Sequence, residues 1–155
     1  MMSDLDEIRY VLSDNGIWYE DKSYLNAYGE FGKLRVPVKT DNVNFNIWFI
    51  IDPEKYGVQT RVLDFFQFEP DKRDKVIVAA NEANSKWVIC KFVVYENYIS
   101  VEYDITARTT NVGWVAYEII KDRFNDILNR AYPIFAEAVS KKCNGDDTHN
   151  ENSNC

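Results

Sequence analysis

The first segment of the chain has apolar residues at helical spacing. Leu5, Ile8 and Leu12 are three or four residues apart, so they share one face of an α-helix. Ser3 precedes this stripe as a possible N-cap, and Asn15-Gly16 follows it as a typical C-terminal stop. The pattern predicts a short amphipathic helix.

The next segment, residues 17–32, mixes aromatic with turn-forming residues, and we interpret it as a loose β-segment and loop. Apolar and polar residues then alternate over 33–39, 43–51 and 58–68, which predicts three strands. Pro37 favours an edge position for the first of them, because proline lacks the N–H that a ladder inside a sheet requires. Along the third strand, one face is expected to carry Val62, Phe66 and Phe68, and the other face Leu63 and Phe65.

A helix and a hairpin form the centre of the predicted fold. Residues 71–84 predict an amphipathic helix, with Asp71 as its N-cap and small apolar residues for close packing. Two strands, within 86–95 and 98–104, are joined by a tight reversal at Glu96-Asn97. The helix stripe contains Val76, Ala80 and Ala83, and one face of the first hairpin strand contains Val88, Cys90, Phe92 and Val94.

The last predicted helix covers residues 113–141, where apolar residues recur every three or four positions. Pro133 lies inside it and is expected to kink the helix or to separate its last turns. Residues 143–155 are polar apart from two cysteines, so we expect a disordered tail.

The predicted order of elements is therefore α-β-β-β-α-β-β-α. Hairpin and meander connections favour a largely antiparallel sheet, and the helices are then expected to cover one of its faces. The length of 155 residues and the lack of an internal repeat indicate one α+β domain, which we place at residues 1–142.

This order, together with three local motifs, resembles the YbjN-like family of bacterial sensory transduction regulators. The motifs are the helix end Asn81-Glu82-Ala83-Asn84, the hairpin over 87–105 and Ala131-Tyr132-Pro133 in the last helix. The likeness extends from Leu5 to Val139. It implies a fold like that of the type III secretion chaperones, homodimerisation and protein binding, with no catalytic residues to transfer.

Charge and composition exclude several partners. The net charge of -7 would repel a nucleic-acid backbone or an anionic membrane surface, and no cluster of basic residues offsets it. No apolar run is long enough to span a membrane, and the first residues lack a secretory signal. Three cysteines do not form a disulfide framework, so a reducing cytoplasm is the expected compartment.

Candidate catalytic residues are few. Cys90 lies on an apolar strand face, which favours a buried structural thiol over a nucleophile. The single histidine, His149, lies in the polar tail, where nothing holds it as a general base. Glu102 and Asp104 share one strand face and could act as a carboxylate pair, but solvation of an outer face is the more economical interpretation. We expect no enzyme activity.

Metal binding is also disfavoured. The ligand types gathered in the tail have no rigid spacing, so we expect neither a metal nor another cofactor. These residues are Cys143, Asp146, Asp147, His149 and Cys155.

The most informative feature is a second apolar face of the sheet. If helices cover one face, the other would expose more apolar surface than a soluble monomer usually tolerates. A second subunit, the helix over 71–84 or a partner chain would have to cover it. The residues expected to bind protein there are Trp48, Ile50, Leu63, Phe65, Trp87 and Ile89, with Val93 and Tyr95 beside them.

The sequence thus predicts a non-enzymatic, homodimeric protein-binding module of chaperone-like or regulatory type. The alternative is a small-molecule sensor or enzyme, with a pocket between the last helix and the sheet near Tyr103, Trp114 and Tyr117. The acidic charge would also suit a protein that neutralises a basic partner.

Overall fold

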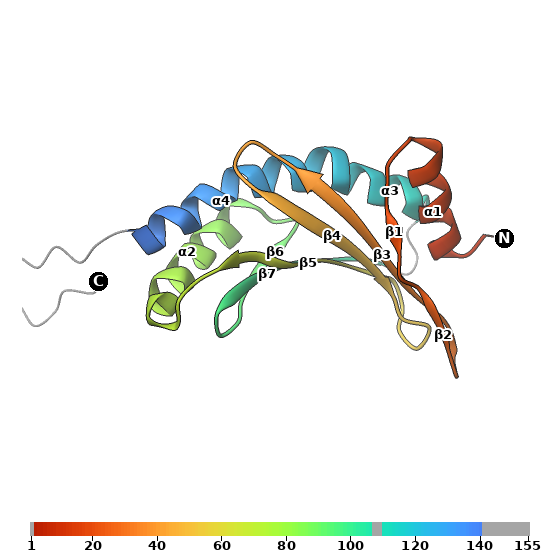
Figure 1. Ribbon diagram of the computed structural model, residues 1–155, viewed down its shortest axis with the longest axis horizontal. Coiled ribbons are helices and arrows are strands. Elements are labelled where there is room, and N and C mark those ends of the chain that lie inside the picture. The colour runs from red at the N-terminus through yellow and green to blue at the C-terminus, as the bar shows by residue number, and fades with distance from the viewer. Residues whose placement is uncertain (1, 107–109, 141–155) are drawn as a thin grey trace, which may run out of the picture.

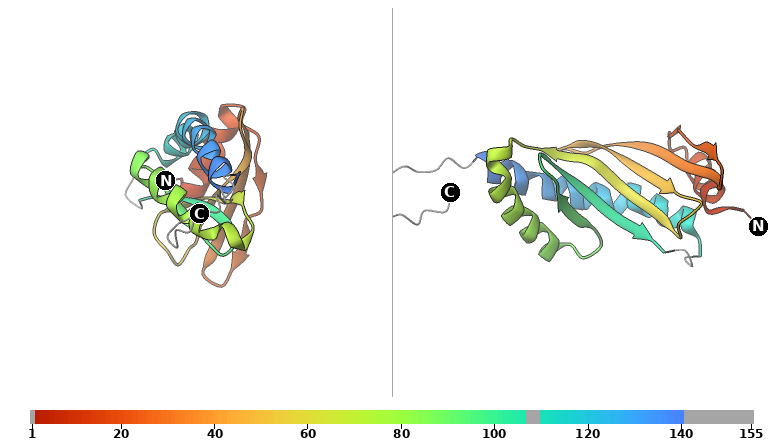
Figure 2. Two further views of the ribbon diagram at one scale, coloured as in Figure 1. Left: turned by 90° about the vertical axis from the view of Figure 1, so that its left-hand side faces the viewer. Right: turned by 90° about the horizontal axis from the view of Figure 1, so that it is seen from below.

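The computed structural model describes residues 2–106 and 110–140. These residues form an α+β domain, in which an antiparallel sheet of seven strands packs against helices (Figure 1). The end-on view in Figure 2 shows the helices on one side of the sheet. The predicted α+β class and the antiparallel sheet are therefore confirmed.

The elements follow one another in this order. The helical segments are α1 (Asp4–Asp14), η1 (Pro70–Lys72, a 3-10 turn), α2 (Arg73–Lys86), α3 (Val112–Glu118), η2 (Ile119–Arg123, π-helical) and α4 (Phe124–Ser140). The strands are β1 (Glu20–Asp21), β2 (Tyr24–Asn26), β3 (Gly29–Lys39), β4 (Asn44–Ile51), β5 (Val58–Gln67), β6 (Lys91–Val94) and β7 (Tyr98–Ile105).

The sheet has the strand order β1-β3-β4-β5-β7-β6, and β2 pairs with the first residues of β3 only. Residues 17–32 therefore contain two short strands that add to β3, and β3 itself begins four residues earlier than the predicted strand. The β2–β3 hairpin projects beyond the sheet (Figure 1). On this hairpin the rings of Tyr24 and Phe31 stack at 5.0 Å, while Leu25 and Tyr28 are exposed.

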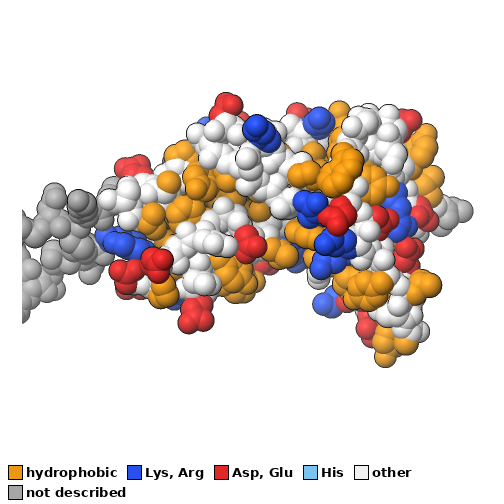
Figure 3. Space-filling view, viewed as in Figure 1, with side chains coloured by type: hydrophobic (Ala, Val, Ile, Leu, Met, Phe, Trp, Pro, Cys, Tyr) orange, Lys and Arg blue, Asp and Glu red, His pale blue; other side chains and the backbone are white. Residues whose placement is uncertain are grey.

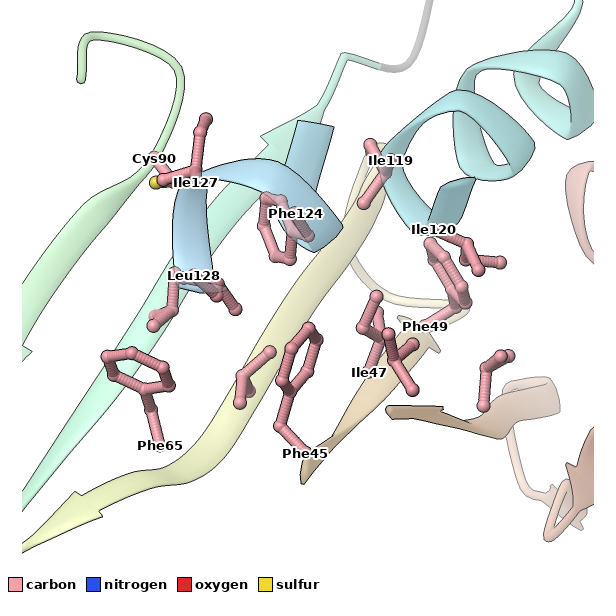
Figure 4. Packing of buried hydrophobic residues seen from close by; sticks show 14 of the residues in the cluster. Phe45, Ile47, Phe49, Phe65, Cys90, Ile119, Ile120, Phe124, Ile127 and Leu128 are labelled. Carbon is pink, nitrogen blue, oxygen red and sulfur yellow. The ribbon is translucent and has the colours of Figure 1, made fainter. Parts of the chain in front are cut away.

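The core lies between the sheet and the helices. Figure 4 shows Phe45, Ile47 and Phe49 of β4 facing Phe124 and its neighbours on the C-terminal helical segments. The alternating strand pattern and the helical stripe are thus buried against each other, which is the main source of stability for such a layered domain.

The first helix agrees with its prediction. The Ser3 hydroxyl accepts a hydrogen bond from the Asp6 N–H, and Leu5, Ile8 and Leu12 are buried. The predicted cap of the central helix is wrong. Asp71 lies in the 3-10 turn, the helix begins at Arg73, and no side chain caps it.

The last helix continues through Pro133 to Ser140, so its last turns are not separated. The irregular turn lies earlier, in η2, where the Phe124 N–H bonds to the Ile119 carbonyl five residues back. Ile119 and Ile120, both in this irregular turn, are buried. The prediction of a disordered tail at 143–155 concerns residues outside those described.

Within residues 2–106 and 110–140, no helix combines the length and the apolar character that a membrane span requires.

Candidate protein-binding face

The candidate site is the face of the sheet that points away from the helices, called the outer face below. Its residues alternate along β3 to β7 with the buried residues of the core. Hydrophobic side chains lie on it among basic and acidic groups (Figure 3). The alternative in which the central helix covers this face is wrong, because α2 packs against α4 and β6 and its buried alanines join the same core as Phe135.

Strand pairing arranges the outer face in two transverse rows. In the first row, Arg35 is opposite Trp48, Trp48 opposite Arg61, and Arg61 opposite Glu102. The second row follows the same strands two residues along and contains Lys33, Ile50, Gln59 and Asp104. From β3 to β7, each row therefore runs from a basic residue to a carboxylate. The first row also continues to Glu20 on β1 and to Lys91 on β6.

Arg61 holds both carboxylates of β7. Its Nη1 lies 2.6 Å from Asp104 Oδ1, its Nε lies 3.7 Å from Glu102 Oε1, and its side chain is only 15% exposed. The Tyr95 hydroxyl donates to Glu102 Oε2 at 3.0 Å, and this bond to an anionic acceptor raises the pKa of Tyr95. Glu102 and Asp104 thus lie on the outer face as predicted, and a guanidinium bridges them.

Cations also hold the aromatic residues at the other side of the face. The Lys33 ammonium lies 4.9 Å from the ring centre of Trp48. Arg35 binds the Glu20 carboxylate at 2.7 Å and the Asn46 side chain at 2.9 Å, and its guanidinium lies 5.6 Å from the Trp18 ring centre. These contacts favour the observed orientations of Trp48 and Trp18.

Three of the six residues predicted to bind protein lie on the outer face. Trp48 and Ile50 are half-buried there, and Leu63 is 40% exposed. Whether they bind protein stays a prediction.

Phe65 was predicted to share this face with Leu63, and that placement is wrong. The ladder between β5 and β7 shifts between Val62 and Phe66, so β5 carries two extra residues at this point. The bulge turns Phe65 inward beside Phe66, where it contacts the rings of Tyr132 and Phe135 in α4.

Trp87 and Ile89 are also misplaced by the prediction. Strand β6 begins only at Lys91, so the residues before it do not alternate between two sheet faces, and Val88 is 96% exposed instead of buried. Trp87 and Ile89 pack against the core, and the Trp87 ring lies 6.2 Å from that of Phe92. The cause is that α2 continues to Lys86 and the chain then needs a loop to reach the sheet.

Arg35 and Arg61 are the important residues of the outer face that the sequence interpretation missed. The same alternation that places Trp48 on this face places both arginines beside it, so the signal was present in the pattern. Tyr98 was missed too, and its ring stacks on that of Tyr95 at 4.9 Å.

Both edges of the sheet are partly protected. At the β6 edge, the Asn84 side chain bonds to the main chain of Phe92 through both its oxygen and its nitrogen. At the other edge, β1 pairs with Leu34 and Arg35, and Pro37 removes a main-chain donor beyond them. Pro37 thus lies where the sequence predicted, on a strand with an open side.

Other candidate chemistry is weak in the described part of the chain. Cys90 is buried beside Ile127 (Figure 4), and burial raises the pKa of its thiol to about 12, which agrees with a structural thiol. Between residues 2 and 106 and between 110 and 140, no group of three or more His, Cys, Asp or Glu side chains could hold a metal. His149 and the other tail ligands lie outside these ranges.

Two of the surface hollows in the described part of the chain stand out, and neither is lined by Tyr103, Trp114 or Tyr117, where the pocket was predicted. One, of about 300 Å³, lies between the open edge of β3 and η2. The other, of about 490 Å³, lies beside Phe68 and Val139 at the far end of the domain.

No family model, curated protein or solved structure matches this chain.

Proposed function

We propose that the chain is a non-enzymatic protein-binding module that acts as a homodimer through its outer face. The observation that carries the proposal is a sheet face that no helix of the described residues covers. Trp48 lies on it between Arg35 and Arg61, and Ile50 and Leu63 lie on the same face. Isolated apolar residues on a surface need no explanation, but a contiguous group on one face favours an interaction site.

The composition of the face supports protein as the ligand. Tryptophan, tyrosine and arginine dominate the energetic centres of protein interfaces, and this face carries Trp48, Tyr95, Tyr98, Arg35 and Arg61. Their side chains are already oriented by cation–π contacts, stacking and ion pairs, so little conformational entropy remains to be lost on binding.

A second copy of the chain is the occupant that the charge pattern favours. The core strands of the sheet are ordered β3-β4-β5-β7. If two copies stack with their outer faces together, a two-fold axis can run parallel to the strands, between the two sheets and midway between β4 and β5. This axis places β3 of one copy opposite β7 of the other. The basic residues of β3 then lie opposite the carboxylates of β7.

The rows specify the pairs. A two-fold axis along the strands preserves the position along them, so Arg35 of one copy is opposite Glu102 of the other, and Lys33 is opposite Asp104. Trp48 is opposite Arg61 in the same arrangement. Each contact occurs twice, as an isologous interface requires.

The predicted relation to the YbjN-like family is part of this proposal. It is supported by the order of the main elements, which agrees with the predicted α-β-β-β-α-β-β-α apart from the short β1 and β2. It is also supported by a structural use for the Asn-x-x-Asn helix end, since Asn84 joins α2 to β6. A chaperone-like or regulatory role follows from that relation.

The decisive experiment is a mass measurement in solution. Light scattering at micromolar concentration should give twice the chain mass of 18.2 kDa for the natural protein, and the chain mass for Trp48→Asp and Leu63→Asp. Val78→Asp is the matched control, because Val78 is 68% exposed on α2 and lies outside the outer face. A monomeric natural protein, or variants of the outer face that remain dimeric, would contradict the proposal.

A further inference from the structure

The smaller hollow lies where the chain leaves the open edge of the sheet. Helix α1 ends at Asp14, Gly16 follows it with a φ of 68°, and the chain then approaches β3 only at Glu20. The last part of β3 therefore has no neighbouring strand on this side. The open hollow of about 300 Å³ is bordered by the loop before β1, the end of β3 and the π-helical segment.

Main-chain groups of β3 face this space. The Lys33 N–H bonds to Ser23 Oγ and its carbonyl accepts from the Lys22 N–H, so Lys33 directs both groups away from β4. Main-chain groups alternate in direction along a strand, so Pro37 and Lys39 direct theirs the same way. Lys39 thus offers an N–H at the hollow, beyond the end of β1.

Positive charge collects at the same place. Lys39 and Lys121 both line the hollow, and within the part of the chain that the structure describes neither has a carboxylate partner. This local positive charge contrasts with the net charge of -7 of the chain. The Asn125 side chain also lines the hollow and adds an amide.

A flat apolar wall completes the site. Trp18 lines the hollow and is 62% exposed, and Arg35 lies against its ring. On the opposite side, the extra residue of η2 changes the phase of the helix, and Ile120, Lys121 and Asn125 all contribute to the lining. The hollow therefore joins an aromatic wall to cationic and N–H donors.

We propose that this hollow binds a small carboxylate that carries a flat aromatic group. The ring would lie on Trp18, and the carboxylate would accept hydrogen bonds from the Lys39 N–H and the ammonium groups of Lys39 and Lys121. The volume is at the lower end for ligand sites, which suits a single ring with a short acidic arm. Arg35 adjoins both this site and the proposed dimer contact, but none of the residues that line the hollow belongs to the two rows, so either proposal can fail alone.

The experiment is an amide NMR titration of the full chain with phenylacetate, with phenylacetamide as the uncharged probe of the same shape. Phenylacetate should give saturable shifts centred on Lys39, Lys121 and Asn125, and phenylacetamide should bind much more weakly. Lys39→Gln and Lys121→Gln should each raise the dissociation constant roughly two- to fivefold, as expected for an exposed ion pair. Trp18→Ala should abolish saturation.

Three controls make the outcome unambiguous. Lys86→Gln, at an exposed lysine of α2, should leave the titration unchanged, and so should Trp48→Asp, which tests the dimer only. The third control is a peptide that ends in phenylalanine with a free carboxylate. If the hollow binds the carboxyl end of a peptide, the dissociation constant of this peptide should be lower than that of phenylacetate. Equal binding of acid and amide, or no saturable shift at these residues, would overturn the proposal.

Discussion

Asn84 and Phe92 are joined by two hydrogen bonds, because the Asn84 amide takes the place of a strand at the β6 edge. Phe92 N–H donates to Asn84 Oδ1 at 2.8 Å, and Asn84 Nδ2 donates to the Phe92 carbonyl at 3.1 Å. A single side chain thus ties the end of α2 to the sheet. It also satisfies an edge that could otherwise pair with another chain.

We therefore expect Asn84→Ala to destabilise the domain. Two hydrogen bonds are lost, so the free energy of unfolding should fall by about 1–3 kcal/mol. Urea denaturation followed by circular dichroism measures the change. Asn81→Ala is the matched control, since Asn81 is exposed on the same helix, and an equal loss for both variants would contradict the role assigned to Asn84.

Acid should weaken the attachment of α1 to the sheet. Arg9 binds Asp6, Asp21 and Glu30 at 2.8–3.0 Å. The pKa of Asp6 is lowered by hydrogen bonds from Arg9 and Ser3. At Asp21, burial acts to raise the pKa, but the bonds from Arg9 and Ser23 outweigh it, and the pKa is lowered.

The lowered pKa values of Asp6 and Asp21 in the folded protein make its stability depend on pH. The stability they contribute is present above the unfolded value of 3.8 and is lost as the pH falls through the lower folded values. Arg9→Gln should cost about 1 kcal/mol at neutral pH, because the network is partly exposed. The same variant should flatten the fall in stability below pH 3.8, measured by denaturation at several pH values. If the free energy of unfolding of Arg9→Gln falls as steeply below pH 3.8 as that of the natural protein, this role of Arg9 is wrong.

Gly113 is required for the close contact between α1 and α3. A Cβ built there would lie 2.6 Å from Val11 Cγ2 and 2.8 Å from the Glu7 carbonyl oxygen. Gly113→Ala should therefore destabilise by about 1–3 kcal/mol through overpacking. Val11→Ala removes only the side-chain part of this clash. Gly113→Ala should therefore lower the melting temperature less in the Val11→Ala background than in the natural protein. A neutral or stabilising Gly113→Ala would contradict the packing described.

The sequence was sufficient to predict the elements whose apolar period is unambiguous. Leu5, Ile8 and Leu12 fit only a helix, and the alternation around Phe45, Ile47 and Phe49 fits only a strand. The order of these elements followed from them, and so did the antiparallel sheet.

The errors at the outer face have local causes. Phe65-Phe66 is apolar at two successive positions, so a period of two cannot show which ring is inside, and a bulge places both inside. Trp87 and Ile89 alternate like strand residues, yet the length of α2 leaves them in a loop. Both features depend on contacts with α4, far along the chain, which a local pattern does not contain.

The proposed dimer is most directly tested by exchanging charges between the rows. Asp104→Lys places a second cation opposite Lys33 of the other copy, and like charges across an interface should weaken dimerisation roughly tenfold or more. Lys33→Asp should have the converse effect, and the double variant Lys33→Asp, Asp104→Lys should restore most of the affinity, since opposite charges again face each other. Sedimentation equilibrium measures the three dissociation constants. Glu54→Lys, which makes the same charge change in the turn after β4, controls for net charge. If the double variant dimerises no better than the single ones, the two-fold arrangement along the strands is wrong.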